Sequence, residues 1–261
     1  MNENCSLLTE IKDGKGIITI NRPKVLNALN KETYLLMKAA IEQMIGDKRV
    51  RVIIFTGTGE KAFCAGGDIC DELALGHYES YEWSRLGHEI YSLIEGSPKP
   101  TIAAINGYCL GGGFELALAC DMRICAKHAK MGAPETKLGV ICGFGGNIRL
   151  PRLIGRGKAK ELLMTGKMID SAEAYRLGLV NDVAPEGGLM ASVDELCAQL
   201  INKSAISLAL IKHAVDYGTE MDTRSAIEFD SALFAVAACT EDKAEGMSAF
   251  LEKREPVFRD R

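Results

Sequence analysis

The chain has 261 residues, of which 47% are hydrophobic and 25% are charged, and its formal net charge is −4. This composition is ordinary for a globular protein, and the length allows one or two domains with a substantial buried core. The slightly acidic balance gives no electrostatic footprint for nucleic acid or an anionic membrane, so neither is expected as a partner. The opening residues MNENCSLLTE have neither a charged nor an apolar leader region, so we expect a cytoplasmic protein.

The cysteines and histidines do not form a recognisable framework. Nine cysteines are spread along the chain, an odd number, and no two of them make a Cys-x-x-Cys pair. The four histidines show no ligand spacing either. A disulfide framework is therefore not expected, and neither is a metal site; reduced thiols that fill small apolar gaps are the expected role.

In the first part of the chain, short apolar runs alternate with helical patterns. The dipeptide Asp13-Gly14 between two alternating runs predicts a β-hairpin. Asn30 is expected to cap a helix, because apolar residues follow it at helical spacing. The expected elements are strands at 7–12, 16–21 and 51–56, and helices from Asn30 to Gly46 and over 79–95.

The second part continues this alternation and then becomes purely helical. The expected strands are 101–105, 122–126 and 179–183, and the expected helices are 113–120, 143–154, 158–165, 171–178, a stripe from 189 to 200, 204–216, 221–238 and 241–254. This order predicts an α/β fold with a helical appendage. We divide it into a core at 1–195, which carries the site, and a C-terminal helical region at 196–261.

The most informative stretch is 101–121, TIAAINGYCLGGGFELALACD, which is nearly free of charge. Its only acid before Asp121 is Glu115. The glycines at 111–113 predict a turn between a buried strand and a short helix, where bare backbone N–H groups point outward and a ligand can come close. Glu115 follows in the first helical turn. An array of donors beside a buried acid is suited to polarising a carbonyl group and moving a proton.

A second glycine turn, Ala65-Gly66-Gly67, and a second isolated acid, Glu135 after Pro134, accompany this stretch. Taken singly, each feature has a bland explanation. Glu115 could simply complement a helix dipole, and Glu135 could be a solvated loop acid. Neither turn fits a nucleotide-binding glycine motif. The combination of two such turns with two such acids is what indicates a site.

At these residues the chain resembles the enoyl-CoA hydratase (crotonase) family. The matching segments are KAFCAGGDI, IAAINGYCLGGGFELALACD and GAPETKLGV…GFGGNIRLPRLIG, supported by NRPKVLNAL near the start and AFLEKREP near the end. The resemblance covers essentially the whole chain. It implies a right-handed spiral of stacked β-β-α units whose C-terminal helices assemble a trimer or a dimer of trimers. It also implies a coenzyme A thioester as substrate and no further cofactor.

The resemblance assigns roles to individual residues. The backbone N–H groups of Ala65 and Gly112 form an oxyanion hole, Glu115 activates water, and Glu135 protonates the α-carbon. Two fixed donors are useful because the thioester oxygen gains negative charge as water adds to the β-carbon. The implied substrate- and CoA-binding residues are Ala28, Ala65, Gly66, Gly67, Asp68, Ile69, Tyr108, Gly111, Gly112, Pro134, Leu138 and Gly143.

The expected reaction is reversible syn hydration of a trans-2-enoyl-CoA to a 3-hydroxyacyl-CoA, as in an enoyl-CoA hydratase or 3-hydroxyacyl-CoA dehydratase. Double-bond isomerisation is an alternative, although isomerases of the family generally manage with one acid. A carnitinyl-CoA-like dehydratase and a non-catalytic acyl-CoA or RNA-binding module also remain open. Cys142 stands where many relatives carry proline, and Ala133 where hydratases often carry glutamine, so the acyl chain is left undecided.

Overall fold

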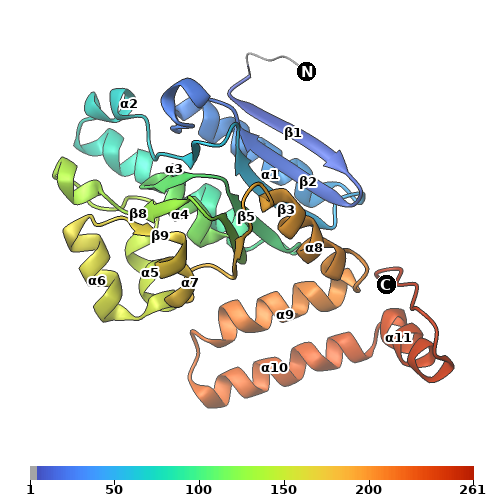
Figure 1. The fold of residues 1–261 in the computed structure, drawn as a ribbon. Coiled ribbons are helices and arrows are strands. Elements are labelled where there is room, and N and C mark those ends of the chain that lie inside the picture. Colours follow the sequence, from blue (N-terminus) through green and yellow to red (C-terminus); the bar gives the residue numbers. More distant parts are fainter. Residues whose placement is uncertain (1–4) are drawn as a thin grey trace.

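The computed structural model describes residues 5–261 and has the predicted α/β architecture with a C-terminal helical region (Figure 1). The first four residues, which belong to the segment from which the lack of a leader was inferred, lie outside the described residues. Within residues 5–261, no helix is both long enough and apolar enough to cross a membrane.

The larger sheet has six strands in the order β1-β2-β3-β5-β7-β10. Their bounds are Leu7–Lys12, Lys15–Ile20, Val52–Gly57, Thr101–Ile105, Met122–Ala126 and Asp182–Ala184. β1 and β2 form the predicted antiparallel hairpin, in which Asp13 and Gly14 both have positive φ, as a two-residue hairpin turn requires. The other pairings are parallel. β5 is buried at every residue, as expected for a parallel strand that is covered on both faces.

A smaller sheet has the order β4-β6-β8-β9 and consists of very short strands. Their bounds are Ala62–Cys64, Tyr108–Leu110, Lys130–Gly132 and Ile169–Asp170. None of these four strands was predicted. β6 follows β5 after only Asn106 and Gly107, so the chain passes from the larger sheet to the smaller one within a single turn. The glycine turns of both predicted motifs follow strands of this smaller sheet, β4 and β6.

Helices cover both sides of the larger sheet. The helices before the C-terminal region are α1 (Lys31–Gly46), α2 (Ile69–Leu73), α3 (His77–Glu95), α4 (Gly112–Ala119), α5 (Gly146–Ile154), α6 (Arg156–Thr165), α7 (Ser171–Arg176) and α8 (Leu189–Ile201). The main core cluster joins α1, α3 and α4 to one face, and a second cluster joins α8 to the other face. α4 is buried at every residue and therefore lies at the centre of the molecule.

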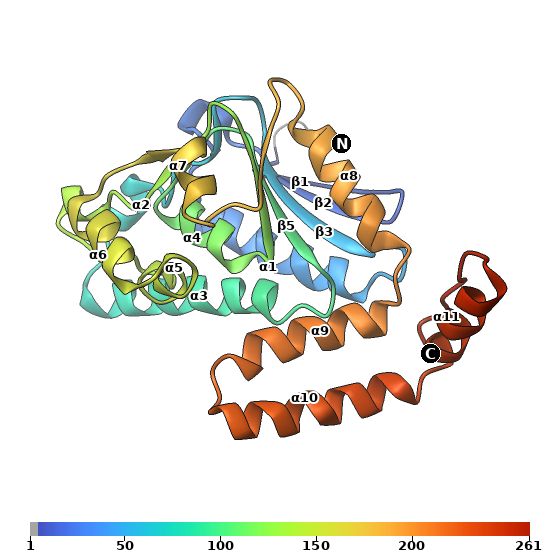
Figure 2. The same ribbon diagram turned by 60° about the horizontal axis from the view of Figure 1, so that its bottom comes forward.

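The C-terminal helices α9 (Ala205–Gly218), α10 (Thr223–Ala238) and α11 (Glu241–Glu252) extend away from the sheets, with α9 and α10 side by side (Figures 1 and 2). No residue of α9 or α10 is fully buried. The boundary predicted at 195/196 falls inside α8, where Val193 and Cys197 both pack on the sheet. The projecting helical region begins with α9.

Candidate active site

The turn before α4 requires glycine at two positions. Gly111 has a φ of +52°, and a Cβ there would lie 3.3 Å from Glu135 Oε1. A Cβ on Gly113 would lie 2.4 Å from the Cys64 carbonyl oxygen, which is too close for any real contact. The glycines therefore let α4 begin directly against β4 and place Glu115 in its first turn.

Glu115 is held from two directions. Its side chain is buried on α4, and its Oε1 atom accepts hydrogen bonds from the backbone N–H groups of Phe144 at 2.8 Å and Gly146 at 2.7 Å. These donors lie at the N-terminal end of α5, where the helix dipole favours a carboxylate. Burial nevertheless dominates, and it raises the pKa of Glu115 to about 7, against the opposing effect of the two N–H groups.

Glu135 begins η2, the short 3₁₀ helix Glu135–Leu138, and has a different environment. Both carboxyl oxygens are shielded from solvent, and neither has a hydrogen-bond partner among the residues that the structure describes. Burial raises the pKa of Glu135. One oxygen of Glu115, one oxygen of Glu135 and the Cys142 thiol all lie within 4.8 Å of one another. The two acids that the sequence singled out therefore meet at one place.

Together, the two carboxyl groups can bind or react with a group that neither could serve alone. Glu115 Oε1 accepts from two backbone donors, so Oε2 is the oxygen left to interact with water or substrate. A group placed between the two carboxyls would satisfy the partnerless oxygens of Glu135. Two carboxylates and a thiol are also possible metal ligands. The expectation that the protein has no metal site therefore remains a prediction.

The second glycine turn is clamped against the segment before α1. Ala65 donates its N–H to the Leu26 carbonyl at 3.0 Å, the Leu29 N–H reaches the Gly66 carbonyl at 2.8 Å, and the Asp68 N–H reaches the Leu29 carbonyl at 2.9 Å. The expected oxyanion donor Ala65 is therefore already engaged inside the protein. This hydrogen bond argues against the sequence-based assignment of Ala65.

Two other N–H groups are free. Within residues 5–261, the backbone N–H groups of Gly67 and Gly112 have no hydrogen-bond partner. The two turns also approach each other, because a Cβ on Gly66 would lie 3.5 Å from the Gly112 nitrogen. Gly67 and Gly112 are thus the donors available to a ligand oxygen between the turns.

The remaining predicted binding residues have varied environments, and their binding roles stay predictions. Ala28 accepts a hydrogen bond from Arg22, which also pairs with Asp68 at 2.9 Å. Ile69 and Leu138 are 57% and 61% exposed, so their apolar side chains are accessible to a ligand or a second chain.

Tyr108, Pro134 and Gly143 complete the predicted set. Tyr108 is exposed and lines a cavity of about 610 Å³ together with Leu26, Lys61 and Lys130. Pro134 directly precedes Glu135. Gly143 accepts a hydrogen bond from the Ser84 hydroxyl at 2.5 Å.

An aromatic cluster that was not predicted from the sequence lies behind α4. Phe144 contacts Tyr34, Trp83 and Tyr91 edge-on, with ring centroids 5.4, 6.0 and 5.9 Å apart. A Cβ on Gly112 would lie 3.1 Å from the Tyr34 hydroxyl and 3.3 Å from the Phe144 ring, so it would point at this cluster. Trp83, the chain's single tryptophan, was the one signal that could have drawn attention to it.

The site thus combines two buried carboxyl groups with two free backbone N–H groups. This arrangement suits an enzyme that transfers protons next to a stabilised oxyanion. The chain belongs to the enoyl-CoA hydratase/isomerase family, whose model matches residues 10–261. The predicted family, fold and enzyme class are therefore confirmed.

Individual relatives agree with this membership. The chain is 43% identical to the crotonyl-CoA hydratase of Syntrophomonas wolfei, with 97% of each chain covered. It is 41% identical to the short-chain-enoyl-CoA hydratase of Clostridium acetobutylicum, with 93% of this chain and 94% of that one covered. Among solved structures, enoyl-CoA hydratase from Bacillus anthracis is similar with a TM-score of 0.95 and 35% identity, covering 98% of this chain and all of that one.

Proposed function

We propose that the protein catalyses the reversible syn hydration of a short trans-2-enoyl-CoA to the 3-hydroxyacyl-CoA. The observation that carries this proposal is the meeting of Glu115 and Glu135 within 4.8 Å. Hydration needs one base for water and one acid for carbon, and in syn addition both act on the same side of the flat alkene. The names of the two most similar relatives described above support a short acyl chain.

In the proposed mechanism, the thioester oxygen accepts hydrogen bonds from the backbone N–H groups of Gly67 and Gly112. Glu115 removes a proton from water, whose oxygen bonds to the β-carbon. The alkene electrons move toward the thioester oxygen, which gains negative charge between the two donors. The α-carbon then takes a proton from Glu135, and the proton held by Glu115 returns to Glu135 through solvent. Net addition of one water results.

This division of roles requires a particular protonation state at each acid. Glu115 must be ionised to act as a base, and its pKa of about 7 keeps a large fraction ionised near neutral pH while leaving it basic. Glu135 must be protonated, and burial moves its pKa upward in the required direction. Because the active form has Glu115 ionised and Glu135 protonated, activity should have a bell-shaped pH dependence.

Two further proposals concern the whole molecule. Exposed apolar side chains on α10 and α11, among them Ile227, Phe234 and Phe250, support assembly into a trimer or a dimer of trimers. Sedimentation of a stable, active monomer would contradict this.

The nine cysteines are all free, which fits a reducing compartment such as the cytoplasm. The mechanism uses no cofactor besides the coenzyme A of the substrate.

A direct assay tests the proposed function. The protein is incubated with crotonyl-CoA, and the loss of the conjugated alkene is followed together with formation of 3-hydroxybutyryl-CoA. A parallel assay with a 3-enoyl-CoA measures isomerisation. We expect hydration to be much the faster reaction. Isomerisation without hydration, or acyl-CoA binding without turnover, would contradict the proposal.

A further inference from the structure

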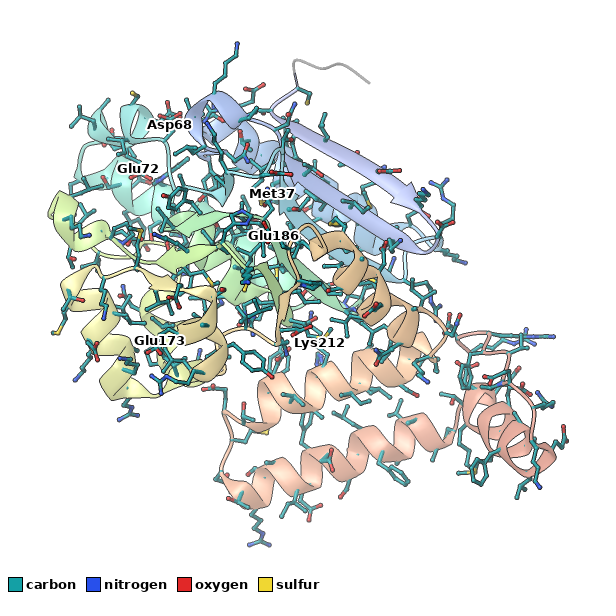
Figure 3. All side chains as sticks on the ribbon, viewed as in Figure 1. Met37, Asp68, Glu72, Glu173, Glu186 and Lys212 are labelled. Atoms are coloured by element: carbon teal, nitrogen blue, oxygen red, sulfur yellow. The ribbon has the colours of Figure 1, made fainter. Side chains whose placement is uncertain are left out.

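A third carboxyl group lies close to the site and has no part in the mechanism above. Glu72 is on α2, at the edge of the molecule where Figure 3 labels it beside Asp68. Its side chain is partly buried, and burial raises its pKa. Its charge also adds to the upward shift of the Glu135 pKa. Glu72 is therefore electrostatically part of the site.

Glu72 packs directly on the second glycine turn. A Cβ on Gly67 would lie only 1.9 Å from Glu72 Oε1, so the carboxyl group occupies the space where any other residue at 67 would place its side chain. The Gly67 N–H is the free donor proposed for the thioester oxygen. A thioester bound there would have the Glu72 carboxyl group close to its acyl portion.

Trp83 on α3 fixes the position of this carboxyl group. Its indole N–H donates to Glu72 Oε1 at 3.2 Å. The Trp83 ring contacts Tyr34 edge-on, with centroids 5.0 Å apart, and Phe144 at 6.0 Å. The Phe144 N–H in turn holds Glu115. The Glu72–Trp83 pair is thus connected through packed rings to the residues that hold the catalytic base.

We propose that the Glu72–Trp83 pair determines acyl specificity by restricting the enzyme to short, uncharged acyl groups. This inference rests on the proposed hydratase function. The single methyl group beyond the crotonyl double bond leaves Glu72 hydrated. A longer alkyl chain would cover the carboxyl group and remove its water without supplying a partner. An acyl group that ends in a carboxylate would meet a like charge.

A purely structural role for Glu72 makes a different prediction. If Glu72 only holds Trp83, then glutamine, which keeps a hydrogen-bond acceptor for the indole, should behave like the wild type with every substrate. If Glu72 acts through its charge, glutamine should change the preference for charged acyl groups. Methionine removes both charge and polarity at similar size, and so it tests the effect on alkyl length.

The experiment compares kcat/KM for crotonyl-CoA, trans-2-octenoyl-CoA and glutaconyl-CoA, whose acyl group ends in a carboxylate. Glu72→Met should raise the octenoyl-to-crotonyl ratio about tenfold or more, the scale of one methylene gained in a hydrophobic pocket. Glu72→Gln should raise the glutaconyl-to-crotonyl ratio about tenfold, because a like charge is gone. Asp71→Asn is the matched control: Asp71 is the exposed neighbour on α2, and both ratios should stay unchanged.

The outcomes separate the two proposals. If the wild type hydrates none of these thioesters, the proposed function fails. If the wild type hydrates crotonyl-CoA and neither Glu72 variant changes its ratio, the specificity role of Glu72 is overturned. Should Glu72→Met fail to fold, the Glu72→Gln ratio alone still decides the question, because that variant keeps the Trp83 hydrogen bond.

Discussion

The two acids of the site are held in opposite ways. Glu115 lies on α4, buried at every residue, and two backbone N–H groups fix one of its oxygens. Glu135 lies on a single 3₁₀ turn, and its oxygens have no partner within residues 5–261. The difference teaches that the fold positions the base completely, whereas the acid is left to be satisfied by water and substrate. Substitutions at each acid and at the nearby backbone donor should separate these two modes of support.

The largest effect is expected from removing either acid. Glu115→Gln and Glu135→Gln should each lower kcat for crotonyl-CoA hydration by about 10²–10⁴, the usual scale for lost acid–base catalysis. Binding of a saturated acyl-CoA should change little, because the amides keep the size of the side chains. Calorimetric titration beside kinetics checks both statements. Full activity in either variant would remove that residue from the mechanism.

The next effect concerns the donor that opens α4. In Gly112→Ala, the new Cβ would press on the Tyr34 hydroxyl and the Phe144 ring, and we expect the start of α4 to yield together with these side chains. Turnover should fall by about 10², as for a displaced oxyanion donor, while the melting temperature falls by only a few degrees.

A second substitution sharpens this test. Tyr34→Phe in the Gly112→Ala background removes the nearest clashing atom, so part of the activity should return. The single Tyr34→Phe variant is the control for loss of the Tyr34–Tyr91 hydrogen bond. Unchanged turnover in Gly112→Ala would place the oxyanion donors elsewhere.

The energetic cost of the buried base should appear in stability. The pKa of Glu115 is about 7 in the folded state and ordinarily 4.5, so the folded protein holds this proton over a pH range in which the unfolded chain has lost it. The contribution of Glu115 to the free energy of unfolding therefore falls as the pH rises from about 4.5 to 7. Urea unfolding at pH 5 and pH 8 checks this. Between these pH values the wild type should lose on the order of 3 kcal/mol of unfolding free energy that Glu115→Gln does not lose. An equal pH dependence in both proteins would show that Glu115 is not the costly group.

The smallest effect is the coupling between the acids. The charge of Glu135 contributes to the raised pKa of Glu115, although burial contributes more. Glu135→Gln should therefore lower the Glu115 pKa by a fraction of a unit, measured by ¹³C NMR titration of labelled glutamate carboxyls. Glu72→Gln is the control, because Glu72 acts on Glu135 and should leave Glu115 nearly unchanged. No change in Glu135→Gln would mean that the acids titrate independently.

The long elements of the fold were predictable because they repeat a pattern. The Asn30 cap, for example, accepts the Thr33 N–H as expected, and α1 ends at Gly46. The smaller sheet was not predictable, because strands such as β4 and β6 have only three residues and show no periodicity. Their existence depends on pairing between segments that are distant in the sequence.

The site was predictable in its residue types and less so in its details. Glu115 and Glu135 could be singled out as isolated acids beside glycine turns, and the family resemblance gave them roles. The motif could not show which N–H of the 65–67 turn is free, because the Ala65–Leu26 hydrogen bond exists only in the folded chain. Glu72 was missed for the same reason: only packing on Gly67 relates it to the site.

The central claim is that Glu115 and Glu135 serve one face of the same alkene. It is tested most directly by hydrating crotonyl-CoA in D₂O and determining, by NMR, where deuterium lies in the product relative to the new hydroxyl group. Because both carboxyls meet within 4.8 Å, the account predicts one deuterium at the α-carbon, added syn to the hydroxyl. Anti addition, or deuterium distributed equally over both α-positions, would contradict it.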